Sequence, residues 1–280
     1  MKTRIVTGIL ICLTMTAVLF LSKTPVYPIT LSILAVIATI EALGVLSLKD
    51  KYILSIPAYV IAAVLPSLAY IMCVIIKTPI YKYVVALALV MFVYVMYLFV
   101  VAVFERGKLS FANLSAGYVF AAYITICFSA LSLINYIGDI GLFCLGMVLI
   151  GAWVSDTMAY FTGVLFGKHK LIPEVSPKKT VEGSIGAIIG TIAAFILYGF
   201  LVSVFTDLTP NYLVLGLSAP ILSVVGQIGD LFASLVKREA GVKDYGKLLP
   251  GHGGIMDRFD SILAVSGATM VIVLLFTPFT

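Results

Sequence analysis

The sequence predicts an all-α, polytopic integral membrane protein with about nine transmembrane helices. Of its 280 residues, 62% are hydrophobic and only 11% are charged, and the mean hydropathy is +1.17. A soluble domain usually carries about a quarter charged residues. This chain therefore has too little polar side-chain surface to cover a water-soluble globule, and we expect most of its surface to face lipid.

Nine apolar runs are long enough to cross a bilayer, since a spanning helix needs about 20 apolar residues. They lie at 5–21, 26–46, 53–76, 82–104, 114–134, 140–166, 184–205, 211–236 and 260–278. The third run contains Pro57 and Pro66, which predict a kink or a break. We expect the first run to be a retained helix rather than a cleaved signal peptide.

The basic residues predict the orientation of the chain. With a cytoplasmic N-terminus, nine helices place 15 Lys and Arg residues on the cytoplasmic side and leave only Lys23, Lys77 and Lys82 outside. This distribution follows the positive-inside rule. The net charge of +5 then reflects topology and attraction to anionic membrane lipids, and it indicates no nucleic-acid partner.

Asp156 and Glu41 are acidic side chains inside these runs, where a charge by default faces a polar cavity or a partner. Asp156 lies well inside the 140–166 run, four residues before Tyr160 on the same helical face. It is either a functional group or one half of a structural pair. Glu41 lies near the predicted cytoplasmic end of the second run. It lines the site, sits at the interface or pairs with a neighbouring helix.

The 211–236 run and the residues just after it carry one polar face on an otherwise apolar helix. Four side chains at spacings of three, four and three form this face, namely Gln227, Asp230, Ser234 and Lys237. Asp257 begins the last helix at the same predicted level. Carboxylates from adjacent helix ends can share a hard cation through their oxygens, and Asp260 could join or orient them. The alternative for Asp257 and Asp260 is stabilisation of a helix N-terminus.

Residues 234–261 form the densest charged stretch, with five of the eighteen basic and four of the thirteen acidic residues. Gly253 and Gly254 can bring backbone N–H groups near phosphate oxygens. His252 could donate to phosphate or could be a structural turn histidine. The earlier polar loop, residues 167–183, contains two adjacent lysines that bind phosphates or only mark the cytoplasmic side. The residues alone thus indicate a metal-dependent phosphoryl- or nucleotidyl-transfer site.

Both polar stretches resemble the phosphatidate cytidylyltransferase family, also called CDP-diacylglycerol synthases. The earlier one has D-T-x-A-Y from Asp156 and S-P-K-K-T-x-E-G from Ser176. The later one matches at Ser234, Lys237, Arg238, Lys243, Asp244, Gly246, Pro250, His252, Gly253, Gly254, Asp257, Arg258 and Asp260, with no departure from the pattern. Over residues 1–150 the resemblance is one of hydropathy alone. We therefore expect residues 1–135 to be scaffold and residues 136–280 to carry the catalytic loops.

The resemblance implies an enzyme of the bacterial inner membrane that condenses CTP with phosphatidic acid, giving CDP-diacylglycerol and pyrophosphate on the cytoplasmic side. It implies Mg²⁺ held by Asp230, Asp257 and Asp260, leaves a second cation open, and implies a homodimer. The implied catalytic residues are Asp156, Asp230, Asp257, Lys237 and Arg238. The implied substrate-binding residues are Ser176, Lys178, Lys179, Thr180, Glu182, Gln227, Ser234, Lys243, Asp244, His252, Gly253, Gly254 and Arg258. Thr180 and Glu182 could alternatively cap the helix that follows them.

Two other functions fit parts of the sequence. One is a different membrane transferase that acts on a lipid phosphate or an alcohol, although the D-G-x-x-A-R motif of CDP-alcohol phosphotransferases is absent. The other is a cation- or proton-coupled transporter that uses Asp156 and Asp230. A transporter more often shows related halves and a site at the membrane midplane. Here the charges gather in two loops predicted on one side.

Overall fold

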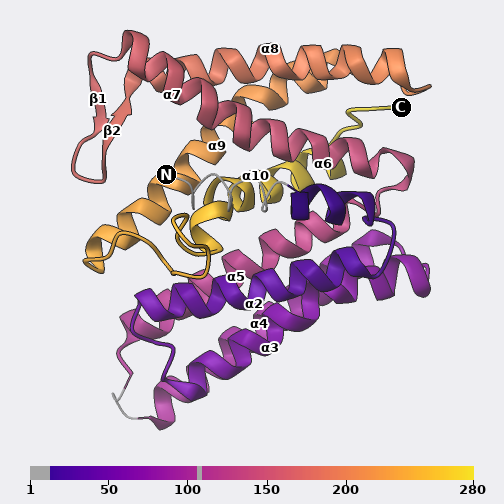
Figure 1. Ribbon diagram of the computed structural model, residues 1–280. Helices are drawn as coiled ribbons and strands as arrows, with labels where there is room; N and C mark the ends of the chain where they lie inside the picture. The colour runs from indigo at the N-terminus through magenta and orange to yellow at the C-terminus, as the bar shows by residue number, and fades with distance from the viewer. Residues whose placement is uncertain (1–12, 106–108) are drawn as a thin grey trace. The chain divides into compact units, whose positions relative to one another are not determined.

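The computed structural model describes residues 13–105 and 109–280, which are mostly helical (Figure 1). In order, its elements are α2 (Val26–Val45), α3 (Tyr52–Tyr70), the π-helix η1 (Ile71–Ile75), α4 (Ile80–Phe104), α5 (Phe111–Ile134), the 3-10 helix η2 (Gly138–Ile140), α6 (Gly141–Leu149), the π-helix η3 (Ile150–Val154), α7 (Ser155–Phe166), strands β1 (Lys170–Ile172) and β2 (Ser176–Thr180), α8 (Val181–Phe205), α9 (Tyr212–Glu239) and α10 (Met256–Leu275).

Within the described ranges, eight helical segments are long and apolar enough to cross a membrane. The predicted all-α membrane class is confirmed, and eight of the nine predicted runs match these segments. The remaining run, 5–21, falls mostly on residues 1–12, outside the described part of the chain, although residues 13–20 are helical. The third run, for which a kink or a break is predicted, is not broken, because α3 stays helical through Pro57 and Pro66 and continues into η1.

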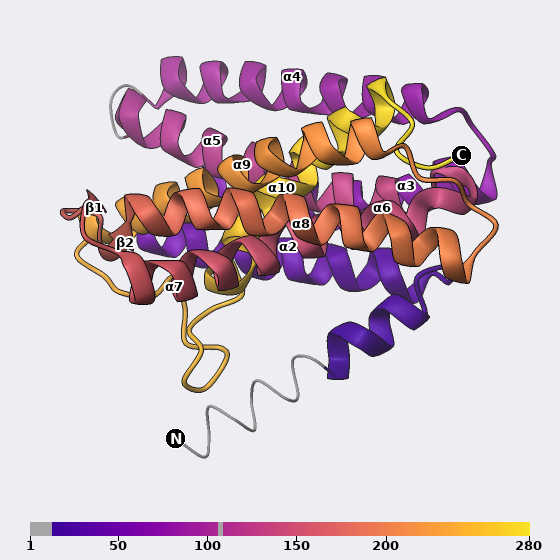
Figure 2. The same ribbon diagram turned by 90° about the horizontal axis from the view of Figure 1, so that it is seen from above.

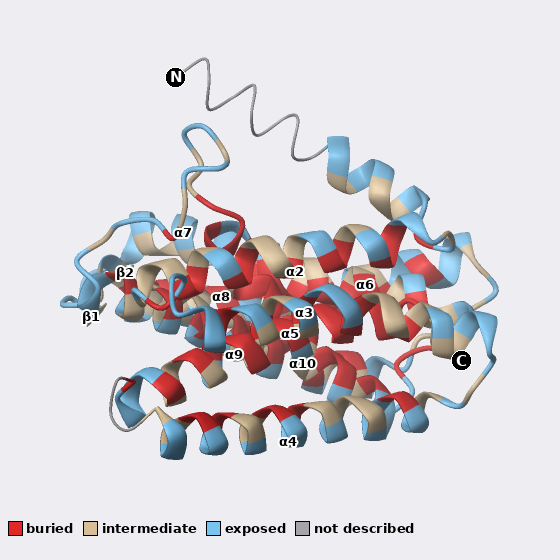
Figure 3. Cartoon of the chain, turned by 90° about the horizontal axis from the view of Figure 1, so that it is seen from below, coloured by how far each residue is buried: buried red, intermediate tan, exposed pale blue. Residues whose placement is uncertain are grey.

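The chain divides into two compact units, residues 1–136 with 242–258 and residues 137–241 with 259–280. In the first unit, α2, α3 and α5 pack on one another, and α4 packs on α3 and α5. Leu43, Leu54, Leu98 and Leu114 belong to its apolar core. Figure 3 shows α5 as largely buried, whereas α4 has a buried edge and an exposed remainder, as expected for a helix facing lipid.

In the second unit, α7 and α8 run alongside each other, and α8 also packs on α9 (Figure 2). The close approach of α7 and α8 requires glycine. A Cβ at Gly186 would overlap Thr162, and a Cβ at Gly190 would overlap Met158. Small residues allow such close helix packing in membranes, where apolar side chains gain little from leaving lipid. This packing fixes the face of α7 that carries Asp156.

Residues 167–180, predicted only as a loop, contain a short antiparallel hairpin of β1 and β2 between α7 and α8 (Figure 1). The hairpin returns the chain directly into α8. Thr180 is the N-cap of α8, where its Oγ1 accepts a hydrogen bond of 3.1 Å from the Gly183 N–H. Such a cap satisfies one of the donors that a helix start leaves without an intrahelical partner. The capping role left open for Thr180 is therefore present.

Candidate active site

The second unit contains a cavity of about 450 Å³ that is lined by residues of α7, the β1–β2 hairpin, α8 and α9. Six of the predicted site residues line it, namely Asp156 from α7, Lys178, Lys179 and Thr180 from β2, and Gln227 and Asp230 from α9. Apolar groups of Tyr160, Val164 and Leu171 share the lining, together with the cation Lys170. The cavity therefore combines charged groups of both signs with an apolar wall.

The central contact in this cavity is an ion pair between β2 and α9. Lys179 Nζ lies 2.6 Å from Asp230 Oδ2 and forms an ion pair with it. The two side chains are only 23% and 27% exposed. The Ser234 hydroxyl donates to Asp230 Oδ1 at 3.5 Å. Lys179 is therefore half-buried with its charge matched by Asp230, whereas the neighbouring Lys178 is exposed.

Two further carboxylates of the same unit come from α7 and α10. The Ser261 hydroxyl donates to Asp156 Oδ2 at 3.2 Å. Asp260 Oδ1 accepts from the Ser261 N–H at 2.8 Å, and Asp260 lies within electrostatic range of Asp156 and Asp230. The negative charge of three helices is thus concentrated in one region of the unit.

A second cavity, of about 490 Å³, lies in the first unit and is formed by the loop before α10. Its lining includes Lys243, Asp244, Gly246, Lys247, Leu249, Pro250, Gly251, His252, Gly253 and Arg258. The loop turns through left-handed backbone at Gly251 (φ +77°) and Gly253 (φ +81°), which only glycine adopts without strain. Three basic side chains and a turn of this kind suit an anionic group.

His252 supports that interpretation of the loop cavity. Its Nδ1 is buried and has no hydrogen-bond partner among the described residues. A buried polar nitrogen without a partner costs free energy, so native proteins usually provide it with one. A phosphate oxygen in the cavity would satisfy this nitrogen if Nδ1 carries the proton.

Asp257 holds the same loop from the start of α10. Its Oδ2 accepts hydrogen bonds from the Tyr245 N–H at 2.7 Å and from the Gly254 N–H at 2.9 Å, and the residue is 6% exposed. Asp257 also lies in the first turn of α10, the position that the helix-start role left open for it requires. Its two hydrogen bonds close the loop on itself. Because Asp230 belongs to the other unit, a metal shared by Asp230 and Asp257 stays a prediction.

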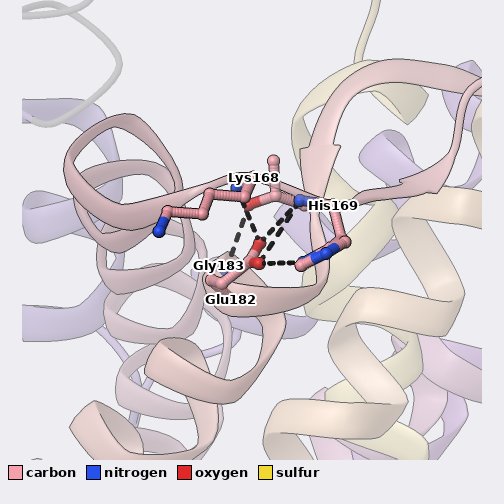
Figure 4. A network of polar contacts seen from close by, with 5 residues as sticks. Lys168, His169, Glu182 and Gly183 are labelled. Atoms are coloured by element: carbon pink, nitrogen blue, oxygen red, sulfur yellow. Dashed lines mark hydrogen bonds and ion pairs between the residues drawn. The ribbon is translucent and has the colours of Figure 1, made fainter.

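The other predicted residues lie outside both cavities. Glu182 fastens the base of the hairpin, since its carboxylate accepts from the Lys168 and His169 N–H groups and lies 2.6 Å from His169 Nδ1 (Figure 4). Ser176 begins β2 and is half-buried. Near the end of α9, Lys237 is buried and Arg238 is exposed. The substrate and catalytic roles of these residues stay predictions.

The donor chemistry of the second unit fits Mg²⁺. Carboxylate oxygens are the protein ligands that this ion prefers, and it usually takes one or two of them together with water and substrate phosphates. Among the described residues, no group of three or more His, Cys, Asp or Glu side chains is arranged to hold a metal. Asp230, with Asp260 beside it, is a suitable pair for an ion that takes its remaining ligands from substrate.

Two lysines that line these cavities were missed by sequence reasoning. Lys170 and Lys247 line the two cavities, but in the sequence they were counted only as cytoplasmic basic residues. Glu41 was left among alternatives, and the structure places its carboxylate against the loop before α10. Their position next to recognised motifs was the only available signal for the two lysines. Glu41 was recognisable as an acid inside an apolar helix, but its partner was not.

Comparison with known proteins gives a consistent result. The model of the cytidylyltransferase family matches residues 2–276. The chain is 33% identical to the phosphatidate cytidylyltransferase of Bacillus subtilis over 273 residues, which cover 95% of this chain and 94% of that relative. It is 41% identical to the protein of that name from Staphylococcus haemolyticus over 163 residues, or 58% of this chain and 60% of the relative. The Staphylococcus epidermidis protein is 50% identical over 113 residues, which are 42% of its length.

The matches thus differ in extent. The two staphylococcal alignments span between two fifths and three fifths of those relatives, whereas the Bacillus alignment and the family model take in almost the whole chain. The motif residues gathered in the two cavities all lie inside the region that the family model matches. The chain belongs to the cytidylyltransferase family.

Proposed function

We propose that this membrane protein condenses CTP with phosphatidic acid, giving CDP-diacylglycerol and pyrophosphate. Family membership supports a cytidylyl transfer, and the relatives named phosphatidate cytidylyltransferase support the lipid phosphate as acceptor. The observation that carries most weight is the cavity of the second unit. It places Lys178 and Lys179 beside an apolar wall that includes Tyr160 and Val164, as the phosphate of a membrane lipid requires.

The reaction needs positioning and charge stabilisation more than a reactive side chain. A phosphate oxygen of phosphatidic acid attacks the α-phosphorus of CTP in line, a new phosphorus–oxygen bond forms, and the bond to pyrophosphate breaks. The lipid phosphate is already ionised near neutral pH, so no enzyme nucleophile is required. Fixed positive charges that meet the negative charge on the oxygens of the transferred phosphate and of the leaving pyrophosphate supply the main catalytic effect.

The linings of the two cavities favour a different substrate in each. The loop cavity is lined by Lys243, Lys247 and Arg258 with little apolar surface, which suits the polyphosphate of a nucleotide. His252 Nδ1 lies there as a further group for a phosphate oxygen. The cavity of the second unit, with its apolar wall, suits the lipid headgroup. Lys179 is held by Asp230 at 2.6 Å, so its charge is positioned before substrate arrives.

Magnesium belongs to the same proposal. Asp230, Asp257 and Asp260 would hold it, and when bound it offsets the negative charge of the two substrates. Asp156, fixed by the Ser261 hydroxyl, would keep the lysines in place or help to bind a second cation. We further propose that the protein lies in the bacterial inner membrane with its active site facing the cytoplasm, and that it forms a homodimer.

The test is direct. Purified protein is mixed with CTP, phosphatidic acid and Mg²⁺, and pyrophosphate release is followed together with formation of the nucleotide lipid. We expect release only when all three are present, with no covalent enzyme intermediate. A protein that binds neither substrate, but moves cations across proteoliposomes, would be the transporter considered from the sequence. A covalently trapped cytidylyl-enzyme would overturn the direct in-line mechanism.

A further inference from the structure

Glu41, in a helix that sequence reasoning assigned to the scaffold, is in contact with the loop before α10. Its Oε2 accepts a hydrogen bond of 2.9 Å from the Met256 N–H, and the backbone of Ile255 also hydrogen-bonds the carboxylate. Met256 is the first residue of α10, so Glu41 takes up donors that a helix start leaves unpaired. A negative charge there also interacts favourably with the helix dipole.

Two glycines of the family motif press on the same carboxylate. A Cβ added at Gly246 or at Gly254 would overlap the carboxylate oxygens of Glu41. Neither glycine has φ in the left-handed region, unlike Gly251 and Gly253. The backbone at Gly246 and Gly254 could therefore accept a side chain, and Glu41 is what excludes one. This explains the absence of side chains at these two positions without invoking a ligand.

The loop is fixed at its other points by groups of the same unit. Asp257 joins Tyr245 to Gly254 through two backbone N–H groups, and the Tyr245 ring packs on Phe120 of α5 with ring centroids 6.3 Å apart. The stretch between these anchors carries His252 and the left-handed glycines that line the cavity. Glu41 is thus one of the groups that hold this segment in place, together with Asp257 and the ring contact of Tyr245.

We propose that Glu41 is a positioning residue, which holds the Lys243–Arg258 loop in the form that presents its basic side chains and His252 to an anionic ligand. The role rests on the proposed function only in taking that ligand to be the triphosphate of CTP. Glu41 touches no substrate in this proposal. It acts through the backbone of α10 and through the two glycines, and so α2 is part of the active centre.

The experiment compares Glu41→Ala, Glu41→Gln and Gly254→Ala in the full-length protein in lipid nanodiscs. Asp50→Asn, which removes an exposed carboxylate from the same unit, is the matched control, and Gly216→Ala is the control for an added methyl, since its Cβ would meet nothing within 4 Å. Two quantities are measured: amide hydrogen exchange of the 242–258 segment, and the KM for CTP separately from the KM for phosphatidic acid.

We expect Glu41→Ala to speed exchange in the 242–258 segment and to raise the KM for CTP by about tenfold or more, the usual effect of losing hydrogen bonds to a charged group. The KM for phosphatidic acid and kcat should change much less. Glu41→Gln keeps a carbonyl oxygen that can accept from the backbone, and it should restore most of the affinity. Both controls should behave like the unchanged protein.

A double-mutant cycle separates the contact from general disruption. Gly254→Ala alone should impair the loop because the methyl group meets the carboxylate, whereas Gly254→Ala combined with Glu41→Ala should be no worse than Glu41→Ala alone. Additive penalties would refute the glycine–carboxylate contact. Unchanged exchange in Glu41→Ala, or Glu41→Gln as inactive as Glu41→Ala, would overturn the positioning role. A protein that is inactive with CTP would contradict the proposed function. The hydrogen-exchange measurement needs no turnover, so it would still test whether Glu41 holds the loop.

Discussion

The Lys179–Asp230 ion pair offers a test that separates stability from catalysis. Lys179→Met and Asp230→Asn each remove one charge, and the double variant removes both. The partners lie 2.6 Å apart and are 23% and 27% exposed, so the pair is neither at the open surface nor fully buried. Exposed pairs are worth up to about 1 kcal/mol, and breaking a buried pair costs about 3–5 kcal/mol. We therefore expect each single variant to lose about 1–3 kcal/mol.

The double variant should be more stable than the sum of the two single effects, because no charge is left unmatched. Single losses of this size lower the unfolding midpoint by roughly 2–10 °C for a chain of this length. Thermal unfolding in detergent measures this directly. The expected coupling between the two positions is about 1–2 kcal/mol.

Turnover should follow a different pattern from stability. Each single variant should reduce pyrophosphate release by about 100-fold or more, the usual effect of removing a group that stabilises the transition state. The double variant should not recover, because the charges needed by metal and phosphate are still missing. Additive losses of stability would refute the coupling inferred from the structure. Recovered turnover in the double variant would show that Asp230 serves only to neutralise Lys179, and the metal proposal would fall.

Three further predictions concern the remaining site and the topology. Asp257→Asn should abolish turnover, but hydrogen exchange should show the 242–258 loop still ordered, since the amide oxygen can replace Oδ2. The double variant Asp230→Asn with Asp257→Asn should be little less active than either single variant. Additive losses of activity would argue against one shared metal. Lys178→Ala should raise the KM for phosphatidic acid about tenfold and leave the unfolding midpoint unchanged. Lys168→Ala, outside the cavity, should have wild-type kinetics. Equal kinetics in the two variants would mean that Lys178 only marks the cytoplasmic side of the membrane. Reporter fusions should place the N-terminus in the cytoplasm and the C-terminus outside, and two ends on one side would contradict the nine-helix topology.

The sequence by itself determined where the spanning helices lie. The predicted run 26–46 corresponds to α2 at Val26–Val45, and the run 82–104 corresponds to α4 at Ile80–Phe104. This agreement has a simple cause, because the bilayer fixes both the length and the composition of a crossing segment. The motif residues also identified the family, which the family model and the Bacillus relative confirm. The sequence-based assignments of catalytic and metal-binding roles stay predictions.

Other features depended on tertiary structure. The hairpin at 170–180 is short, polar and largely exposed, and it carries no hydrophobic period from which strands could be predicted. The lysine that meets Asp230 was one of two neighbours that look equivalent in sequence. Which of them turns toward α9 depends on the direction in which β2 leaves the hairpin.

Glu41 shows most clearly what tertiary structure adds. It is separated from Met256 by 215 positions, and a single acid in an apolar helix carries no information about its partner. The partner is chosen by how α2 packs and by where the loop before α10 turns. Backbone N–H groups and glycines carry no side-chain chemistry that a motif search could pair with a distant carboxylate. That contact exists only in the folded chain, where α2 packs against the start of α10.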